Sequence, residues 1–160
     1  MEKTNVMRVL DQKKVKYTPH CLGENTTTVG EEVAQARGKD AACVFKTLVT
    51  VGKSGANYVF VVPVAGELDL KKAAKAVGEK SIEMIKSREL LPLTGYIHGG
   101  CSPIGMKKFF KTTFDISAKD KETICFSAGK IGYQVEVAPG DVSKVIRFTF
   151  ADIAKEQDQP

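Results

Sequence analysis

Hydrophobic residues recur at helical spacing near the start of the chain. Thr4 can cap a helix over roughly residues 5–15, and the apolar positions that would form its buried side are Val6, Met7, Val9, Leu10 and Val15. Residues 16–21 then read as extended. Residues 28–31, Thr-Val-Gly-Glu, form a capping box, which predicts a second helix that ends near Gly38. The first quarter of the chain is therefore expected to hold two helices around one extended segment.

Runs of β-branched and aromatic residues dominate the middle of the chain. Residues 43–51 (CVFKTLVTV) and 58–64 (YVFVVPV) predict two strands, and the turn-forming residues between them favour a hairpin. A helix capped by Asp69 and ended by Gly78 is expected next. Ser81 is expected to open another helical stretch, which ends around Leu91-Pro92.

The second half of the chain is rich in strand-like segments. The strands expected there cover residues 96–98, 112–117, 122–128, 133–138 and 147–150. Pro139 is expected to start a short helix through Val145, and residues 155–160 to form a frayed tail. This order of elements predicts one α+β domain over residues 1–160, in which a mixed β-sheet curls into a partial barrel flanked by helices.

Composition and charge narrow the class of protein. Of 160 residues, 42% are hydrophobic and 27% charged, as in soluble globular domains, and no run of about 18 apolar residues could span a membrane. The charged start of the chain does not resemble a signal peptide, so a cytoplasmic location is expected. The net charge of +5, carried by 20 lysines and four arginines, suits an anionic partner such as nucleic acid or a phosphorylated metabolite.

The cysteines do not suggest a metal site. Cys21, Cys43, Cys101 and Cys125 form no C-x-x-C pair, and the chain has only two histidines. Free thiols are therefore expected, with no metal and no cofactor. Cys101 is the one cysteine in a glycine-rich loop, three residues after His98, which leaves a Cys nucleophile as an alternative although no local signature supports it.

Lys46 interrupts an otherwise apolar strand. By alternation it shares a face with Val44 and Leu48, whereas Phe45, Thr47 and Val49 take the other. Two interpretations remain open: an edge-strand lysine with its ammonium group in water, or a lysine in a cavity that binds phosphate or polarises a carbonyl. Glu136, in the strand at 133–138, is either the partner of this lysine or solvent-facing.

Two glycine-containing turns could contribute backbone groups to a site. Residues 95–108 (GYIHGGCSPIGMKK) are either a turn-rich loop between strands or the wall of a pocket in which a ligand touches amide groups. Ser127, Gly129 and Gly132 lie in a tight turn between two expected strands, which is most simply a hairpin turn.

Taken together and in this order, these motifs resemble the YbaK/EbsC family. The segments that carry the resemblance are FKTL at 45–48, the loop through GGCSPIG at 99–105 with Lys107-Lys108, and SAGK at 127–130 through EVAP at 136–139. Members are free-standing relatives of the editing domain inserted in bacterial prolyl-tRNA synthetases, and the chain looks most like the YbaK-type Cys-tRNA(Pro) deacylases. The resemblance covers nearly the whole chain and implies a pocket for the aminoacylated 3′ end of tRNA.

The resemblance also implies roles for individual residues. It makes Lys46 the catalytic residue, and the substrate-binding residues that it implies are His20, Val29, Gly99, Gly100, Ser127, Gly129 and Glu136. The lysines expected to attract the tRNA backbone are Lys107, Lys108, Lys111 and Lys130. Relatives often carry aromatic residues at the two wall positions that here hold His20 and Val29, so selectivity between small amino acids stays open.

The implied function is trans-editing: hydrolysis of mischarged Cys-tRNA(Pro), assisted by the thiol of the substrate. The motifs supply no Ser-His-Asp triad, metal cage or obvious general base, which fits an intramolecular attack that forms a thiolactone. The alternatives are a deacylase for Ala-tRNA(Pro) or another small residue that uses a positioned water, a non-catalytic module that binds tRNA or a synthetase, and a thiol-redox protein. A transient complex with prolyl-tRNA synthetase is a further expectation.

Overall fold

The computed structural model describes residues 2–21 and 41–156. The helix expected after the capping box at 28–31, and Val29 with it, lie outside the described residues. The end of the expected tail, at 157–160, lies outside them as well.

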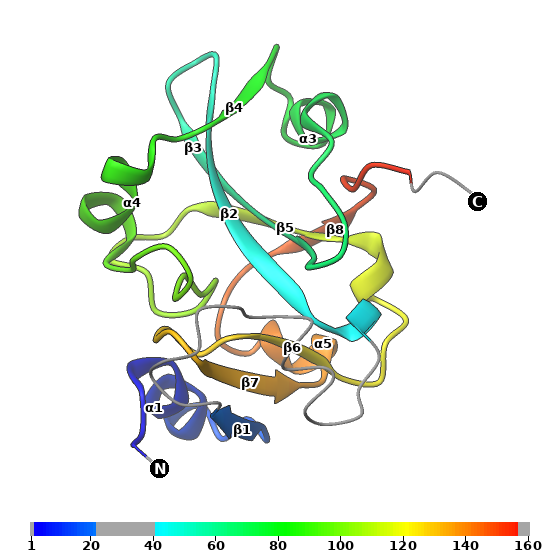
Figure 1. The fold of residues 1–160 in the computed structure, drawn as a ribbon. Coiled ribbons are helices and arrows are strands. Elements are labelled where there is room, and N and C mark those ends of the chain that lie inside the picture. Colours follow the sequence, from blue (N-terminus) through cyan, green and yellow to red (C-terminus); the bar gives the residue numbers. More distant parts are fainter. Residues whose placement is uncertain (1, 22–40, 157–160) are drawn as a thin grey trace.

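Helices are interspersed among the strands along the described chain (Figure 1). In order they are α1 (Asn5–Gln12), β1 (Thr18–Cys21), the 3-10 turn η1 (Ala41–Cys43), β2 (Phe45–Gly52), β3 (Asn57–Pro63), α3 (Leu70–Val77), β4 (Ile82–Met84), α4 (Ser87–Thr94), β5 (Lys111–Asp115), the 3-10 turn η2 (Ile116–Ala118), β6 (Ile124–Ser127), β7 (Tyr133–Val137), α5 (Pro139–Val142) and β8 (Thr149–Ala151).

The strands form two sheets. The larger sheet has the order β4-β2-β3-β5-β8, antiparallel across β4, β2 and β3 and parallel across β3, β5 and β8. The smaller sheet, β1-β7-β6, is antiparallel and lies below the larger one in Figure 1. A parallel bridge between Val44 and Cys125 ties the start of β2 to β6. The expected α+β fold with a mixed sheet is confirmed, and the two sheets do not close into a barrel.

The expected hairpin in the middle of the chain is the longest strand pair. Strands β2 and β3 pair from Phe45 opposite Pro63 to Val51 opposite Asn57. The hairpin separates two hydrophobic clusters. One contains Val49, Phe114 and Phe126 with the buried side of α1, and the other contains Phe60 with α3. The hairpin is therefore the wall between the two parts of the core.

Side-chain caps start α1 and α3 as the sequence predicts. The hydroxyl of Thr4 accepts from the amide of Met7 at 3.3 Å, and the carboxylate of Asp69 accepts from the amides of Lys71 and Lys72. Gly78 ends α3 in the left-handed region at φ 76°.

The helical stretch expected from Ser81 to Pro92 is wrong in its first part. Residues 82–84 form the short strand β4, which pairs with Thr50–Gly52, and only residues 87–94 are helical. Pairing with a free sheet edge outweighs the local helical pattern here, because tertiary hydrogen bonds decide the state of such short segments. The helix α4 starts where Glu89 accepts from the amide of Lys86 at 3.1 Å.

The strand expected at 96–98 is also absent from the described structure. Gly95 ends α4 at φ 86°, and the chain then turns so that the amide of Gly100 donates to the carbonyl of Ile97 at 3.0 Å. The segment folds back on itself instead of extending along a neighbouring strand.

None of the described helices is long and apolar enough to cross a membrane.

Candidate active site

A cavity of about 410 Å³ opens beside the first half of β2. This strand pairs with β3 on one side along residues 45–51, whereas β4 pairs with it on the other side only at Thr50–Gly52. The earlier residues of β2 therefore line the cavity, together with β4, α4, the glycine-rich loop and the smaller sheet. Polar groups come from the side chains of Lys46, Thr47, Cys101, Ser127 and Gln134 and from the backbone of Gly99. Most of the other lining residues are apolar.

The cavity brings together three residues that the sequence predicts for the site. Lys46, Gly99 and Ser127 come from β2, the glycine-rich loop and the end of β6, and all three line it. Of the described residues that line the cavity, none is Asp or Glu. The described part of the wall therefore has a cation and neutral polar groups and no carboxylate.

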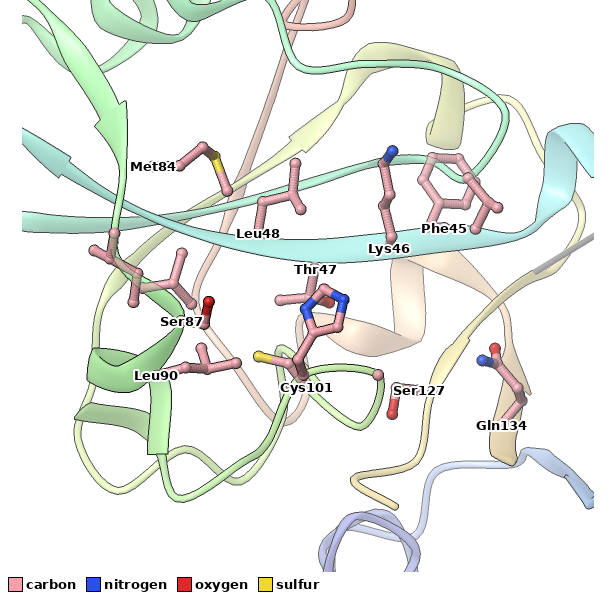
Figure 2. A pocket seen from close by; sticks show the side chains of 15 residues that line it. Phe45, Lys46, Thr47, Leu48, Met84, Ser87, Leu90, Cys101, Ser127 and Gln134 are labelled. Carbon is pink, nitrogen blue, oxygen red and sulfur yellow. The ribbon is translucent and has the colours of Figure 1, made fainter. Parts of the chain in front are cut away.

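Lys46 and its neighbour Thr47 leave β2 on opposite faces. Figure 2 shows the amine of Lys46 on the side of Leu48 and Met84, and Thr47 pointing toward Cys101 and Ser127. Lys46 is half-buried, and no carboxylate of the described chain pairs with it. Its charge is thus available to a ligand at the mouth of the cavity.

Two buried oxygen atoms in the cavity wall have no hydrogen-bond partner in the described part of the chain. They are Oγ1 of Thr47 and Oε1 of Gln134. Gln134 is only 3% exposed, so this oxygen is withheld from bulk water as well. Buried polar groups are nearly always paired in folded proteins, and unpaired ones inside a cavity mark places where a ligand can bind. Sequence reasoning singled out neither residue.

Ser127 is oriented by its own turn. Its hydroxyl oxygen accepts from the amide of Gly129 at 3.1 Å, and its side chain is nearly buried at the edge of the cavity. Because the oxygen accepts this bond, the hydroxyl hydrogen can be donated to a ligand. Gly129 itself is absent from the residues that line the cavity and supports the site through this bond.

The two adjacent glycines of the loop differ in what their amides do. Gly99 lines the cavity at φ 88°, whereas Gly100 is buried and its amide donates to Ile97. A Cβ atom on Gly100 would lie 3.3 Å from the amide nitrogen of Ile131, so the loop packs its backbone closely against the turn after β6. The amides of Gly99 and Cys101 have no acceptor among the described residues and are free to donate to a ligand.

Tyr96 is the buried support under both glycine-containing turns. Its hydroxyl donates to the carbonyl of Ile104 at 2.5 Å, and burial raises the pKa of Tyr96 to about 12. A Cβ on Gly105 would lie 2.6 Å from that hydroxyl, and one on Gly129 would lie 3.0 Å from the ring. Only glycine fits this closely at two positions whose φ is positive, so the ring fixes the loop and the turn together.

Cys101 lines the cavity as a neutral thiol. Burial raises the pKa of Cys101 to about 12. A thiol is nucleophilic only as its thiolate, so at neutral pH this side chain is inert. The environment of Cys101 thus argues against the alternative of a Cys nucleophile.

His20 and Glu136 form a pair in the smaller sheet, next to the cavity. Nε2 of His20 lies 3.0 Å from Glu136, which also accepts from the hydroxyl of Thr123 at 2.6 Å. Neither residue of the pair is among those that line the cavity, but Gln134 lies two residues before Glu136 on the same face of β7. The side chain of Glu136 is only 10% exposed, so the solvent-facing interpretation is wrong.

The predicted tRNA-binding lysines divide into two groups. Lys107, Lys108 and Lys111 are exposed around the end of the glycine-rich loop and the start of β5. Lys130 instead pairs with Glu2 at 3.2 Å and lies 5.1 Å from the ring centre of Tyr133. The described residues contain no cluster of three or more His, Cys, Asp or Glu side chains that could hold a metal ion.

Comparison with known proteins identifies the family. Residues 23–145 match the model of the aminoacyl-tRNA editing domain. The chain is 43% identical over 157 residues to "Putative Cys-tRNA(Pro)/Cys-tRNA(Cys) deacylase EbsC" of Enterococcus faecalis, an alignment that covers 98% of this chain and 96% of that protein. It is 30% identical over 129 residues to a "Proline--tRNA ligase" of Shouchella clausii, covering 80% of this chain and 22% of the ligase.

A solved structure agrees with these relatives. It is described as "Crystal structure of a putative trans-editing enzyme for prolyl tRNA synthetase", and it matches with a TM-score of 0.82 at 26% identity, over 94% of this chain and 95% of that one. The resemblance to the YbaK/EbsC family is confirmed. From its sequence, its fold and its cavity, the chain belongs to the aminoacyl-tRNA editing domain family.

Proposed function

We propose that this protein removes cysteine from mischarged Cys-tRNA(Pro) by hydrolysing the ester to the terminal ribose. The observation that carries the proposal is the cavity beside β2, where Lys46, Gly99 and Ser127 meet on a mainly apolar wall. Its volume of about 410 Å³ is within the range of small-ligand sites, and it suits one small aminoacyl group with its ribose. The 43% identical relative carries the same activity in its name.

The nucleophile in this proposal is the thiol of the substrate. Cys101 is held neutral by burial, and the described residues that line the cavity include no carboxylate that could act as a general base. An intramolecular nucleophile needs less from the protein, because proximity alone is worth roughly 7–11 kcal/mol. The protein then has to bind the ester in a bent conformation and stabilise the charge that develops on it.

The reaction has two balanced steps. First, the cysteinyl sulfur forms a bond to its own carbonyl carbon, the bond from that carbon to the ribose oxygen breaks, and the thiol proton passes to the ribose oxygen. The products are tRNA with a free hydroxyl group and a four-membered thiolactone. Water then adds to the thiolactone carbonyl and the carbon–sulfur bond breaks, which yields free cysteine.

Three of the predicted site residues line the cavity, and each has a role in the proposed reaction. Lys46, at the mouth of the cavity, binds the terminal phosphate or the ester oxygen. The amide of Gly99 stabilises the oxyanion, and the amide of Cys101 is a better second donor than that of Gly100, which is already bonded to Ile97. A donor of this kind is typically worth about 2.7–4 kcal/mol. Ser127 donates its hydroxyl hydrogen to a ribose oxygen.

The outer surface is proposed to hold the tRNA backbone. Lys107, Lys108 and Lys111 are exposed beside the loop that lines the cavity and would attract phosphates without reading sequence. Selection of tRNA(Pro) would then come from a transient complex with prolyl-tRNA synthetase, in the cytoplasm. The relation to a proline–tRNA ligase is consistent with such a partner.

The proposal is tested by following ester loss from Cys-tRNA(Pro), Ser-tRNA(Pro), Ala-tRNA(Pro) and Pro-tRNA(Pro) with purified protein. Rapid loss of cysteine alone is expected, since serine has the same shape without the thiol. If the serine or alanine ester is hydrolysed as fast as the cysteine ester, the nucleophile is a positioned water and not the substrate thiol. Binding of charged and uncharged tRNA alike, with no ester loss, would make the protein a binding module.

A further inference from the structure

Gln134 lines the cavity and carries a buried amide oxygen that has no hydrogen-bond partner in the described part of the chain. It lies in the middle of β7, and its backbone is held on both sides, opposite His20 in β1 and Ser127 in β6. The side chain therefore starts from a fixed point in the smaller sheet. Figure 2 shows it at one end of the cavity, on the same side as Ser127.

The side-chain amide oxygen of Gln134 has no hydrogen-bond partner in the described chain. It is buried, the residue is 3% exposed, and no group of the described chain donates to it. Oγ1 of Thr47 is in the same condition and lines the same cavity. A buried acceptor without a donor is unfavourable, and a ligand that carries N–H donors would remove this penalty.

The charges of the residues that line the cavity determine which kind of hydrogen-bond donor can bind there. Among the described residues, the lining includes Lys46 and no Asp or Glu, so this part of the wall offers a cationic group no carboxylate. Neutral oxygen acceptors are what such a group can use instead. An aminoacyl ester carries an α-amino group with two or three N–H donors beside the reacting carbonyl, and two free acceptors in one cavity match it.

We infer that Gln134, with Thr47, binds the free α-amino group of the aminoacyl ester, so that the site selects esters whose amine is not acylated. The inference rests on the proposed function, and it names the chemical class of substrate more narrowly. N-acylated esters, such as those of a growing peptide or a formylated residue, keep only one N–H and add an acyl group, so they could not donate to both acceptors. The structure thereby assigns Gln134 as a substrate-binding residue that distinguishes mischarged tRNA from tRNA carrying a peptide.

The test compares two esters that differ only in the amine. Cys-tRNA(Pro) and 3-mercaptopropionyl-tRNA(Pro) share the thiol and the ester, and the second lacks the α-amino group. Rates are divided by the uncatalysed rate of each ester, because the amine also activates the carbonyl. Gln134→Met removes the acceptor at similar size, Gln134→Glu keeps an oxygen acceptor, and Gln12→Met on the exposed end of α1 is the matched control.

We expect Gln134→Met to lower the rate only for the ester that carries the α-amino group. Gln134→Met should slow Cys-tRNA(Pro) by about 10- to 100-fold and leave the mercaptopropionyl ester within about 2-fold, while Gln134→Glu and Gln12→Met keep the preference for the amine. Equal slowing of both esters by Gln134→Met would overturn the inference and make Gln134 a structural residue. A wild-type protein that shows no preference for the amine would overturn it too.

A binding measurement separates this inference from the proposed function. Calorimetry with 3′-cysteinylamido-3′-deoxyadenosine and its 3-mercaptopropionyl counterpart needs no turnover. If no ester is hydrolysed but Gln134→Met weakens only the amine-bearing ligand, the proposed reaction fails and the inference stands. If esters are hydrolysed and the two ligands lose affinity equally, the inference fails alone.

Discussion

The two ends of strand β2 treat their polar groups in opposite ways. At the end near the hairpin turn, the hydroxyl of Thr50 donates to the carbonyl of Tyr58 at 2.9 Å, and the side chain of Asn57 donates to the carbonyl of Thr50 at 3.1 Å. Ser54 and the hydroxyl of Tyr58 both donate to Glu79, at 2.5 and 2.6 Å. This end of the strand is closed by paired groups.

At the other end, three residues earlier in the same strand, the hydroxyl of Thr47 has no partner in the described chain. Within the described chain, Lys46 pairs with no carboxylate, and the amide oxygen of Gln134, which also lines the cavity, has no hydrogen-bond partner. The same residue type thus stabilises the fold at position 50 and is left open at position 47. This contrast supports our proposal that the cavity end of β2 binds a ligand, whereas the paired groups at the hairpin end stabilise the fold.

The largest expected effect comes from the charge at the open end. Lys46→Ala should lower the rate of Cys-tRNA(Pro) deacylation by at least about 100-fold, because no other Lys or Arg is among the described residues that line the cavity. Lys53→Ala, at the exposed hairpin turn, is the control and should stay near wild type. Rates are compared at equal protein concentration, with thermal melting to check the fold. An active Lys46→Ala variant would remove this residue from the mechanism.

Gly129→Ala should lower the stability of the fold and should affect substrate binding only indirectly. The substitution places a methyl group at φ 93°, 3.0 Å from the ring of Tyr96, so the free energy of unfolding should fall by about 1–3 kcal/mol. Gly140→Ala is the matched control, since nothing lies within 4 Å of its added Cβ. Urea unfolding measures both. Wild-type stability in Gly129→Ala would show that Tyr96 does not hold this turn.

The closed end should show a pH dependence through Glu79. Hydrogen bonds from Ser54, and then from Tyr58, lower the pKa of Glu79 below its usual 4.5. A lowered pKa in the folded state contributes stability above the unfolded-state value, and that contribution is lost as the pH falls through the folded-state pKa. The urea midpoint of wild type should therefore exceed that of Glu79→Gln at pH 7, and the difference should shrink below about pH 4. If the difference between the two urea midpoints does not change with pH, the negative charge of Glu79 does not stabilise this end of the strand.

The smallest expected effect is at Cys101. Because burial raises its pKa to about 12, only about one molecule in ten thousand carries the thiolate at pH 8. Iodoacetamide should leave Cys101 unmodified in the folded protein and label the exposed Cys21, as mass spectrometry can show. Unfolding in urea should make both react. Rapid labelling of Cys101 in the folded state would restore the Cys nucleophile as an alternative.

Much of this contrast could be predicted from the sequence, because it depends on local pattern. Alternation in FKTLVTV placed Lys46 and Thr47 on opposite faces, and the turn residues between β2 and β3 predicted the hairpin. The motifs around Lys46, Gly99 and Ser127 led to the family that comparison shows. Each of these signals is contained within a few neighbouring residues.

Features that depend on contacts between distant residues, or on exact backbone angles, could not be predicted from the sequence. Residues 82–84 form a strand only because the edge of β2 at Thr50–Gly52 is there to pair with. The bond from the amide of Gly100 to the carbonyl of Ile97 is local, but it depends on φ and ψ angles that composition does not set. Gln134 left a signal in YQVEV, since it shares a face with Glu136, but its lack of a partner is a property of the folded cavity.

The central claim is tested most directly by substituting the two threonines of β2 in parallel. Thr47→Val and Thr50→Val make the same chemical change three residues apart, and both are measured for Cys-tRNA(Pro) ester loss and for urea unfolding. The account predicts a crossed result. Thr47→Val should lose about 10-fold in rate with unchanged stability, and Thr50→Val should lose about 1 kcal/mol of stability with an unchanged rate. If both variants lose stability alone, the open end of β2 does not serve the substrate.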